Sequence, residues 1–104
     1  MAAYSFHATG TGPDAQTVFD QMVAASPGRN IGTKTRFTTI PLPDGVYEDD
    51  RREVADAADM LIAAEDPRIA DRNGPVGCFE IGPVEGLPAG HELFLFFGWT
   101  NSLD

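Results

Sequence analysis

The first strand is predicted by a two-residue alternation near the start of the chain. Tyr4, Phe6 and Ala8 are apolar, and the residues that alternate with them, through Thr9, are polar. Successive side chains of a strand point to opposite faces of a sheet, so this pattern is typical of a strand that is buried on one face only. We therefore expect a half-buried strand over residues 4–9.

A helical pattern follows, from about residue 13 to residue 25. Pro13 suits the first turn, where its missing N–H would have no partner in the helix, and Asp14 suits the positively charged end of a helix. Ser26-Pro27-Gly28 ends the pattern. The apolar positions that recur at helical spacing and form one face are Ala15, Val18, Phe19, Met22 and Val23.

A second helix is predicted from about Asp50 to Glu65. Asp50 and Glu53 have the spacing of a capping box, with aspartate in place of serine or threonine. Asp66-Pro67 closes the helix because the residue before a proline disfavours helical geometry. The apolar stripe on its buried face consists of Val54, Ala57, Ala58, Leu61 and Ile62.

Three more strands complete the predicted fold. Thr33–Ile40 is rich in β-branched residues, and its polar and basic side chains favour the edge of a sheet. Val76–Gly82 and His91–Thr100 follow, and they are expected to pair as a C-terminal antiparallel hairpin. The order strand, helix, strand, helix, strand, strand predicts an α+β domain over residues 1–104. It would have one four-stranded sheet with both helices on one face.

The last strand is apolar on both sides, which two helices on one face would not explain. One side carries Leu93, Leu95, Phe97 and Trp99, and the other side carries Phe94 and Phe96. A strand of this kind is normally covered on both faces. Either a loop, a second copy of the chain in a homodimer or a different partner would then cover Phe94 and Phe96, because large exposed apolar patches mark contact surfaces.

Charge is distributed unevenly and narrows the class of partner. Residues 1–47 hold three acidic and three basic residues, whereas residues 48–104 hold thirteen acidic and four basic residues, and the net charge of the 104-residue chain is −9. Such a field repels phosphate, so we expect no direct binding of nucleic acid or of an anionic membrane. No apolar run approaches the ~20 residues of a membrane span, and a soluble, cytoplasmic protein is expected.

The acidic face of the second helix is the first candidate interaction site. Asp49, Glu53, Asp56 and Asp59, together with Arg52, fall on the side opposite the apolar stripe. Acids at helical spacing can occupy a basic groove of another protein by imitating a phosphate backbone, and they are equally typical of a solvated helix face. If this face has a function, the pattern predicts that it binds a basic protein partner.

A glycine pattern near the start of the chain indicates a second kind of site. Gly10, Gly12 and Ala15 fit G-x-G-x-x-[GA] between a strand and a helix, which resembles a dinucleotide-binding turn. However, Pro13 removes an N–H that a phosphate would use, and Asp14 places a negative charge at the phosphate position. The pattern is therefore interpreted as a tight turn, with a ligand pocket near His7, Gly10, Gly12 and His91 as the alternative.

Other catalytic chemistry finds little support in the sequence. His7, His91 and Cys78 do not form the closely spaced pairs typical of a zinc site, and no G-x-S-x-G motif is present. Cys78 lies within a predicted strand, where cysteine is usually a small core residue. No catalytic residue, metal or cofactor is therefore assigned.

Two segments resemble the C-terminal halves of small uncharacterised proteins of high-GC bacteria and of their phages and plasmids. These segments are DPRIADRNGPVGCFEI, residues 66–81, and LFLFFGWTNS, residues 93–102. The resemblance covers about half of the chain and includes no catalytic signature. It implies an accessory role associated with a phage or mobile element.

The sequence thus leads to two functional hypotheses. In the first, the protein is a non-enzymatic interaction, accessory or inhibitory factor that acts through the acidic helix face and the apolar side of the last strand. In the second, it is a small-ligand binding protein or small enzyme with a pocket at the first strand-to-helix turn.

Overall fold

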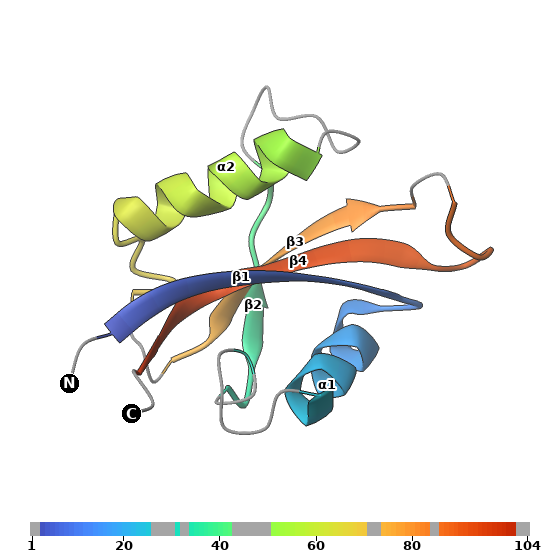
Figure 1. Ribbon diagram of the computed structural model, residues 1–104, viewed down its shortest axis with the longest axis horizontal. Helices are drawn as coiled ribbons and strands as arrows, with labels where there is room; N and C mark the ends of the chain where they lie inside the picture. Colours follow the sequence, from blue (N-terminus) through green and yellow to red (C-terminus); the bar gives the residue numbers. More distant parts are fainter. Residues whose placement is uncertain are drawn as a thin grey trace.

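The computed structural model describes residues 3–25, 31, 34–42, 51–70, 74–83 and 86–101, which form one four-stranded sheet with two helices (Figure 1). The predicted α+β class, the single sheet and the order of elements are confirmed. The elements are β1 (Ala3–Gly12), α1 (Ala15–Ala25), β2 (Phe37–Thr39), α2 (Arg51–Ala63), β3 (Val76–Gly82) and β4 (Glu92–Asn101).

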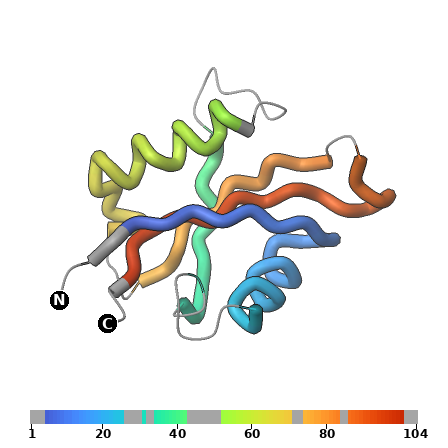
Figure 2. Tube along the Cα trace, in the orientation of Figure 1, coloured from blue at the N-terminus to red at the C-terminus, as the bar shows by residue number. Residues whose placement is uncertain are grey.

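The strands lie in the order β1-β4-β3-β2. β4 is antiparallel to both β1 and β3, so the predicted C-terminal hairpin is confirmed, while β2 is parallel to β3. β2 lies at one edge, as predicted for the Thr33–Ile40 segment, and β1 lies at the other. Figures 1 and 2 both show β1 beside β4 along the length of the sheet.

The two helices pack on opposite faces of the sheet, so the prediction that both lie on one face is wrong (Figure 1). The reason lies in the strand order. The chain crosses from β1 to the far edge at β2, and then returns one strand to β3. Parallel crossovers are almost always right-handed, so two crossovers that run in opposite directions place their helices on opposite faces.

This arrangement explains why β4 is apolar on both sides. Leu93, Leu95 and Phe97 belong to the core on the α2 face, while Phe94 and Phe96 belong to the core on the α1 face. Phe94 is 1% exposed and Phe96 is 0% exposed, so the prediction that these two side chains form a contact surface for a partner or a homodimer is wrong. The cover is provided by α1 and β2, because Phe96 contacts Phe19 and Phe37 with ring centroids 5.8 and 5.7 Å apart.

The glycines of the G-x-G pattern lie within β1 and not in a turn. Gly10 pairs with Phe94, and Gly12 pairs with Glu92. A Cβ atom added at Gly10 would lie 2.6 Å from Val18 Cγ1, and one added at Gly12 would lie 2.7 Å from Val18 Cγ2. The absence of side chains at these positions therefore allows α1 to lie close against β1.

Helix α1 is capped by Asp14, as the sequence predicts for an acid at this end. The Thr17 backbone N–H donates to Asp14 Oδ1 over 2.7 Å, so Asp14 is the N-cap residue and Pro13 lies just before the helix instead of in its first turn. This hydrogen bond lowers the pKa of the Asp14 carboxyl below its ordinary value. The position that a bound phosphate would need is occupied by the protein's own carboxylate.

The Asp66–Ile69 segment ends α2 and returns the chain to the core. Glu65 has a positive φ of 52°, in the left-handed region, and the Asp66 N–H donates to the Leu61 carbonyl. Together these features form the C-terminal cap of α2. The Arg68 guanidinium donates to both Asp66 carboxylate oxygens over 2.9 and 2.8 Å, which lowers the Asp66 pKa to about 2. The DPRI segment of the family resemblance is thus a structural helix stop that buries Ile69.

Strand β2 is shorter than the predicted Thr33–Ile40. Only Phe37–Thr39 pairs with β3, and Lys34 precedes the strand. The Lys34 side chain is 4% exposed and its Nζ donates to the Gly74 carbonyl over 3.2 Å, so it does not protect the sheet edge as predicted.

Candidate functional site

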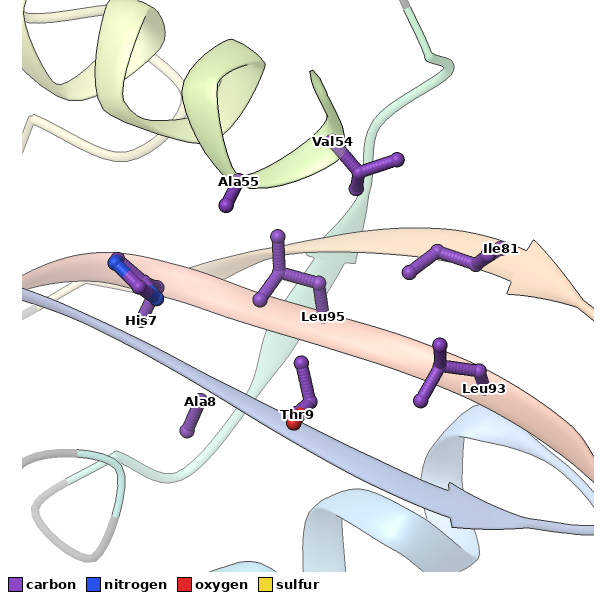
Figure 3. A pocket seen from close by; sticks show the side chains of 8 residues that line it. All are labelled: His7, Ala8, Thr9, Val54, Ala55, Ile81, Leu93 and Leu95. Atoms are coloured by element: carbon purple, nitrogen blue, oxygen red, sulfur yellow. The ribbon is translucent and has the colours of Figure 1, made fainter. Parts of the chain in front are cut away.

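A groove lies between the edge strand β1 and helix α2 and contains a cavity of about 350 Å³ (Figure 3). Its floor and walls are mainly apolar, with a polar margin on β1. In Figure 3, Val54 and Ala55 extend from α2 toward the sheet, and Leu95 extends toward them from β4. The lining residues are His7, Ala8, Thr9, Val54, Ala55, Ile81, Leu93 and Leu95.

The groove exists because the apolar stripe of α2 packs on the inner strands, while β1 faces the helix with polar side chains. The apolar stripe of α2, which includes Val54 and Ala58, shares a core cluster with residues of β3 and β4, and that cluster contains no residue of β1. On this side β1 carries polar, exposed residues, among them Ser5, His7 and Thr9. A polar strand margin offers no apolar surface for the helix to cover, so the outer side of the groove stays accessible.

The polar margin includes a histidine close to an aspartate. His7 Nε2 on β1 lies 3.8 Å from Asp59 Oδ1 on α2, and the two side chains are 47% and 59% exposed. A protonated His7 imidazole would therefore pair with the Asp59 carboxylate across the opening of the groove. At this exposure the pair contributes little to stability and remains available to a ligand.

The outer face of α2 continues from this margin. Glu53, Asp56 and Asp59 are all exposed, as the sequence predicts for the acidic face, whereas Asp49 lies outside the described residues. Met60 lies on the same face and is 73% exposed, the largest exposure of a bulky apolar side chain in the described part of the chain. We call these four residues, Glu53, Asp56, Asp59 and Met60, the acidic-Met face.

Met60 is the residue of this face that sequence reasoning missed. Its positions relative to Asp56 and Glu53, four and seven residues along the helix, place all three on one side. That spacing was sufficient to find it, because an apolar residue among acids breaks the pattern of an ordinary solvated face. Its side chain belongs to neither core cluster.

The predicted ligand-binding residues are not brought together. His7 lines the cavity, but Gly10 and Gly12 pack against Val18 of α1 on the other side of the sheet. His91 precedes β4, where its backbone N–H donates to the Pro88 carbonyl, and it does not line the cavity. The cavity near His7 therefore lies on the opposite face of the sheet from the contacts of Gly10 and Gly12.

Cys78, the remaining candidate for catalytic chemistry, has a structural role. Cys78 is buried in the core on the α1 face, and burial, with a smaller contribution from Glu80, raises the pKa of its thiol to about 12. Such a thiol is a poor nucleophile at neutral pH. Within the described ranges, no group of three or more histidine, cysteine, aspartate or glutamate side chains could hold a metal ion.

No helix in the described part of the chain is long and apolar enough to cross a bilayer. Comparisons of the chain with protein-family models, with curated proteins and with solved structures gave no match. The resemblance to small proteins of high-GC bacteria and their mobile elements thus stays a prediction, and the groove and the acidic-Met face are the features that indicate a function.

Proposed function

We propose that this protein is a non-enzymatic interaction factor, of an accessory or inhibitory kind, that binds a basic partner protein through the acidic-Met face and the adjoining groove. The observation that carries the proposal is the exposure of Met60 among the acids of α2. A flexible apolar side chain surrounded by charge resembles the anchor and polar rim of a protein interface.

The charge of the molecule supports the choice of a basic partner. The net charge is −9, and the acids of the acidic-Met face are presented on one side of a single helix. Complementary charge raises the rate of association and selects the partner, while the affinity comes mainly from the buried apolar anchor. The homodimer through Phe94 and Phe96 is not part of the proposal, because these residues lie in the core.

Photo-crosslinking from position 60 tests this proposal. A protein with benzoylphenylalanine in place of Met60 would be irradiated in extract of the source cells, beside a matched protein with the same group at Gln21, which is exposed on α1. We expect a discrete adduct with a basic protein from position 60 and none from position 21.

Charge reversal then separates binding from accidental proximity. The Glu53→Lys/Asp56→Lys double variant in the position-60 protein should reduce the adduct by about ten-fold, because each reversal replaces an attraction by a repulsion. Asp20→Lys on α1 is the control and should leave the yield unchanged. Equal adduct yields from positions 60 and 21, or an adduct insensitive to charge reversal, would show that α2 is not the binding face.

A second candidate function is the binding of a small, largely apolar ligand in the cavity beside His7. The specific observation is the volume of about 350 Å³ with a mainly apolar lining and few polar groups, which is typical of small-molecule sites. A ligand of this kind should raise the melting temperature, and the shift should be lost when Ala55→Trp fills the cavity. A shift retained in Ala55→Trp would place the ligand elsewhere.

A further inference from the structure

We propose that β1 is a docking edge at which an extended segment of the partner adds a fifth strand to the sheet, with a basic residue opposite His7 and an apolar residue opposite Thr9. The inference rests on the proposed function and gives it a binding mode. It specifies a partner segment in which a basic and an apolar residue are two positions apart.

The edge of the sheet at β1 is long and unprotected. β1 is ten residues long and pairs with β4 without a register shift, and in the described sheet it has no neighbour on its other side. Half of the N–H and C=O groups of such a strand point away from the sheet. Proteins usually protect long edges with proline, lysine or a bulge, and residues 3–12 contain no proline and no lysine.

A cavity lies behind this edge. Thr9 on β1 borders a space that is floored by Leu93 and Leu95 of β4. In strand addition, backbone hydrogen bonds provide affinity and pockets for alternate side chains provide specificity. A side chain of the incoming strand that lies opposite Thr9 on the α2 side can reach this cavity, whose volume is sufficient for one leucine or phenylalanine.

A negative charge lies beside His7, which is on the same side of β1 as Thr9. His7 lies two residues from Thr9, so the two share one side of β1. Asp59 Oδ1 lies 3.8 Å from His7 Nε2 and is exposed at the margin of the groove. A lysine or arginine opposite His7 would therefore lie beneath Asp59, and its positive charge would replace the imidazole as the partner of the carboxylate.

Charge also favours a partner segment over a second copy of this chain. Antiparallel pairing of two β1 strands around a two-fold axis would place both α2 helices on the same face of an extended sheet. The two Asp59 margins would then approach each other, and each copy has a net charge of −9. Like charges brought together in this way destabilise the pairing.

Synthetic peptides test this mode directly. The probe is the blocked peptide Thr-Leu-Thr-Lys-Thr-Leu-Thr, which reads the same in both directions and so presents the basic and apolar residues two positions apart in either strand orientation. The control Thr-Thr-Leu-Lys-Leu-Thr-Thr has the same composition and charge, but its leucines point to the other side of the strand. A third peptide carries the probe sequence with every residue N-methylated, which removes all backbone donors, whichever edge of the peptide faces β1, and leaves the side chains in place.

Two readouts report binding at the edge. Amide hydrogen exchange of β1, followed by NMR, should slow on addition of the probe, because the outward N–H groups of β1 become hydrogen-bonded. Fluorescence of Trp99, which pairs with Ser5 across the β1–β4 register, follows binding independently. We expect the control peptide to bind about ten-fold more weakly than the probe, because its leucines are not buried in the cavity. We expect the N-methylated peptide not to bind.

Variants of the protein locate the two side-chain contacts. Asp59→Asn should weaken binding of the probe peptide by about two- to five-fold, as expected for the loss of an exposed ion pair. Asp20→Asn on α1 should leave this binding unchanged. Ala55→Trp should fill the cavity, so that the leucine of the probe cannot enter it, and the protein should no longer prefer the probe over the control peptide. Both changes lie at exposed or half-exposed positions, so the fold is retained.

The outcomes separate this inference from the proposed function. Equal binding of the probe and the N-methylated peptide, or no change in β1 exchange, would overturn strand addition. Protection of β1 that grows with protein concentration in the absence of peptide would also overturn it, in favour of a second copy at this edge. The crosslink from position 60 does not depend on these results, so the interaction proposal can stand when strand addition fails.

Discussion

The two faces of the sheet each carry one helix, but the helices sit against β1 in different ways. On the α1 face, β1 presents Gly10 and Gly12, and α1 lies so close that a Cβ atom at either glycine would overlap with Val18. On the α2 face, β1 presents polar residues such as His7 and Thr9, and a cavity of about 350 Å³ remains between strand and helix. The same strand therefore seals one face and leaves a groove on the other.

This difference shows that the choice of residue at alternate positions of one edge strand decides where the molecule is closed and where it can bind. Small residues on one side allow the helix backbone to approach, while polar residues on the other side give α2 no surface to cover. The closed face is expected to carry stability, and the grooved face is expected to carry function.

The strongest test of the closed face is Phe96→Ala. Phe96 is 0% exposed and contacts both Phe19 and Phe37, so its removal should leave a cavity and lower the free energy of unfolding by about 3–5 kcal/mol. Met60→Ala on the acidic-Met face should change it by less than about 0.5 kcal/mol. Urea denaturation measures both, and similar losses for the two variants would contradict the assignment of core and contact face.

The second test breaks the close packing of α1 on β1. Gly10→Val should lower the free energy of unfolding by about 2–3 kcal/mol, because the new side chain overlaps with the stiff, β-branched Val18. Thr9→Val is the matched control, since it places valine at the neighbouring position on the exposed side of the strand. If both variants were equally stable in urea, the glycines would have no packing role.

The third test closes the groove. Ala55→Leu should raise the free energy of unfolding by about 1 kcal/mol, because the added methylene groups fill part of the cavity above Leu93 and Leu95. Ala24→Leu at an exposed position of α1 is the control for helix propensity and should give no comparable gain. A gain of equal size in the control would indicate that the cavity is not filled by the new side chain.

The local parts of this fold could be predicted from sequence, whereas the parts that depend on strand order could not. The bounds of β3 agree with the predicted Val76–Gly82, and β4 differs by one residue at each end, because dense apolar runs bounded by glycine and proline leave little ambiguity. The position of α2 and its acidic face also follow from helical spacing. The order β1-β4-β3-β2 has no local signal, and the face occupied by each helix depends on it.

The glycine pattern shows the same limit at the level of single residues. Locally, Gly10 and Gly12 indicate a turn, since glycine is the usual residue of a tight strand-to-helix connection. In the structure their role is set by Val18 and by the pairing of β1 with β4, and these contacts cannot be read from a short window. The groove was missed for this reason too, because it requires the edge position of β1 and the packing of the apolar stripe of α2 on residues of β3 and β4.

The smallest expected effect belongs to the helix start on the closed face and depends on pH. The Thr17 N–H donates to the ionised Asp14 carboxylate, so the pKa of Asp14 is lower in the folded chain than its ordinary value of 3.8. The unfolded chain thus binds the proton more readily, and the stabilisation is fully present at neutral pH and is lost as the pH falls below about 4.

Asp14→Ala should accordingly lower the melting temperature by less than about 5 °C at pH 7, and the difference from the parent protein should shrink as the pH falls below about 4. Comparing the variant with the parent at each pH cancels the contribution of Asp66, whose pKa of about 2 makes it titrate in the same acidic range. A difference that stays constant through this range would mean that the Asp14 carboxylate does not cap α1, and the closed face would then owe its helix start to packing against Gly10 and Gly12 alone.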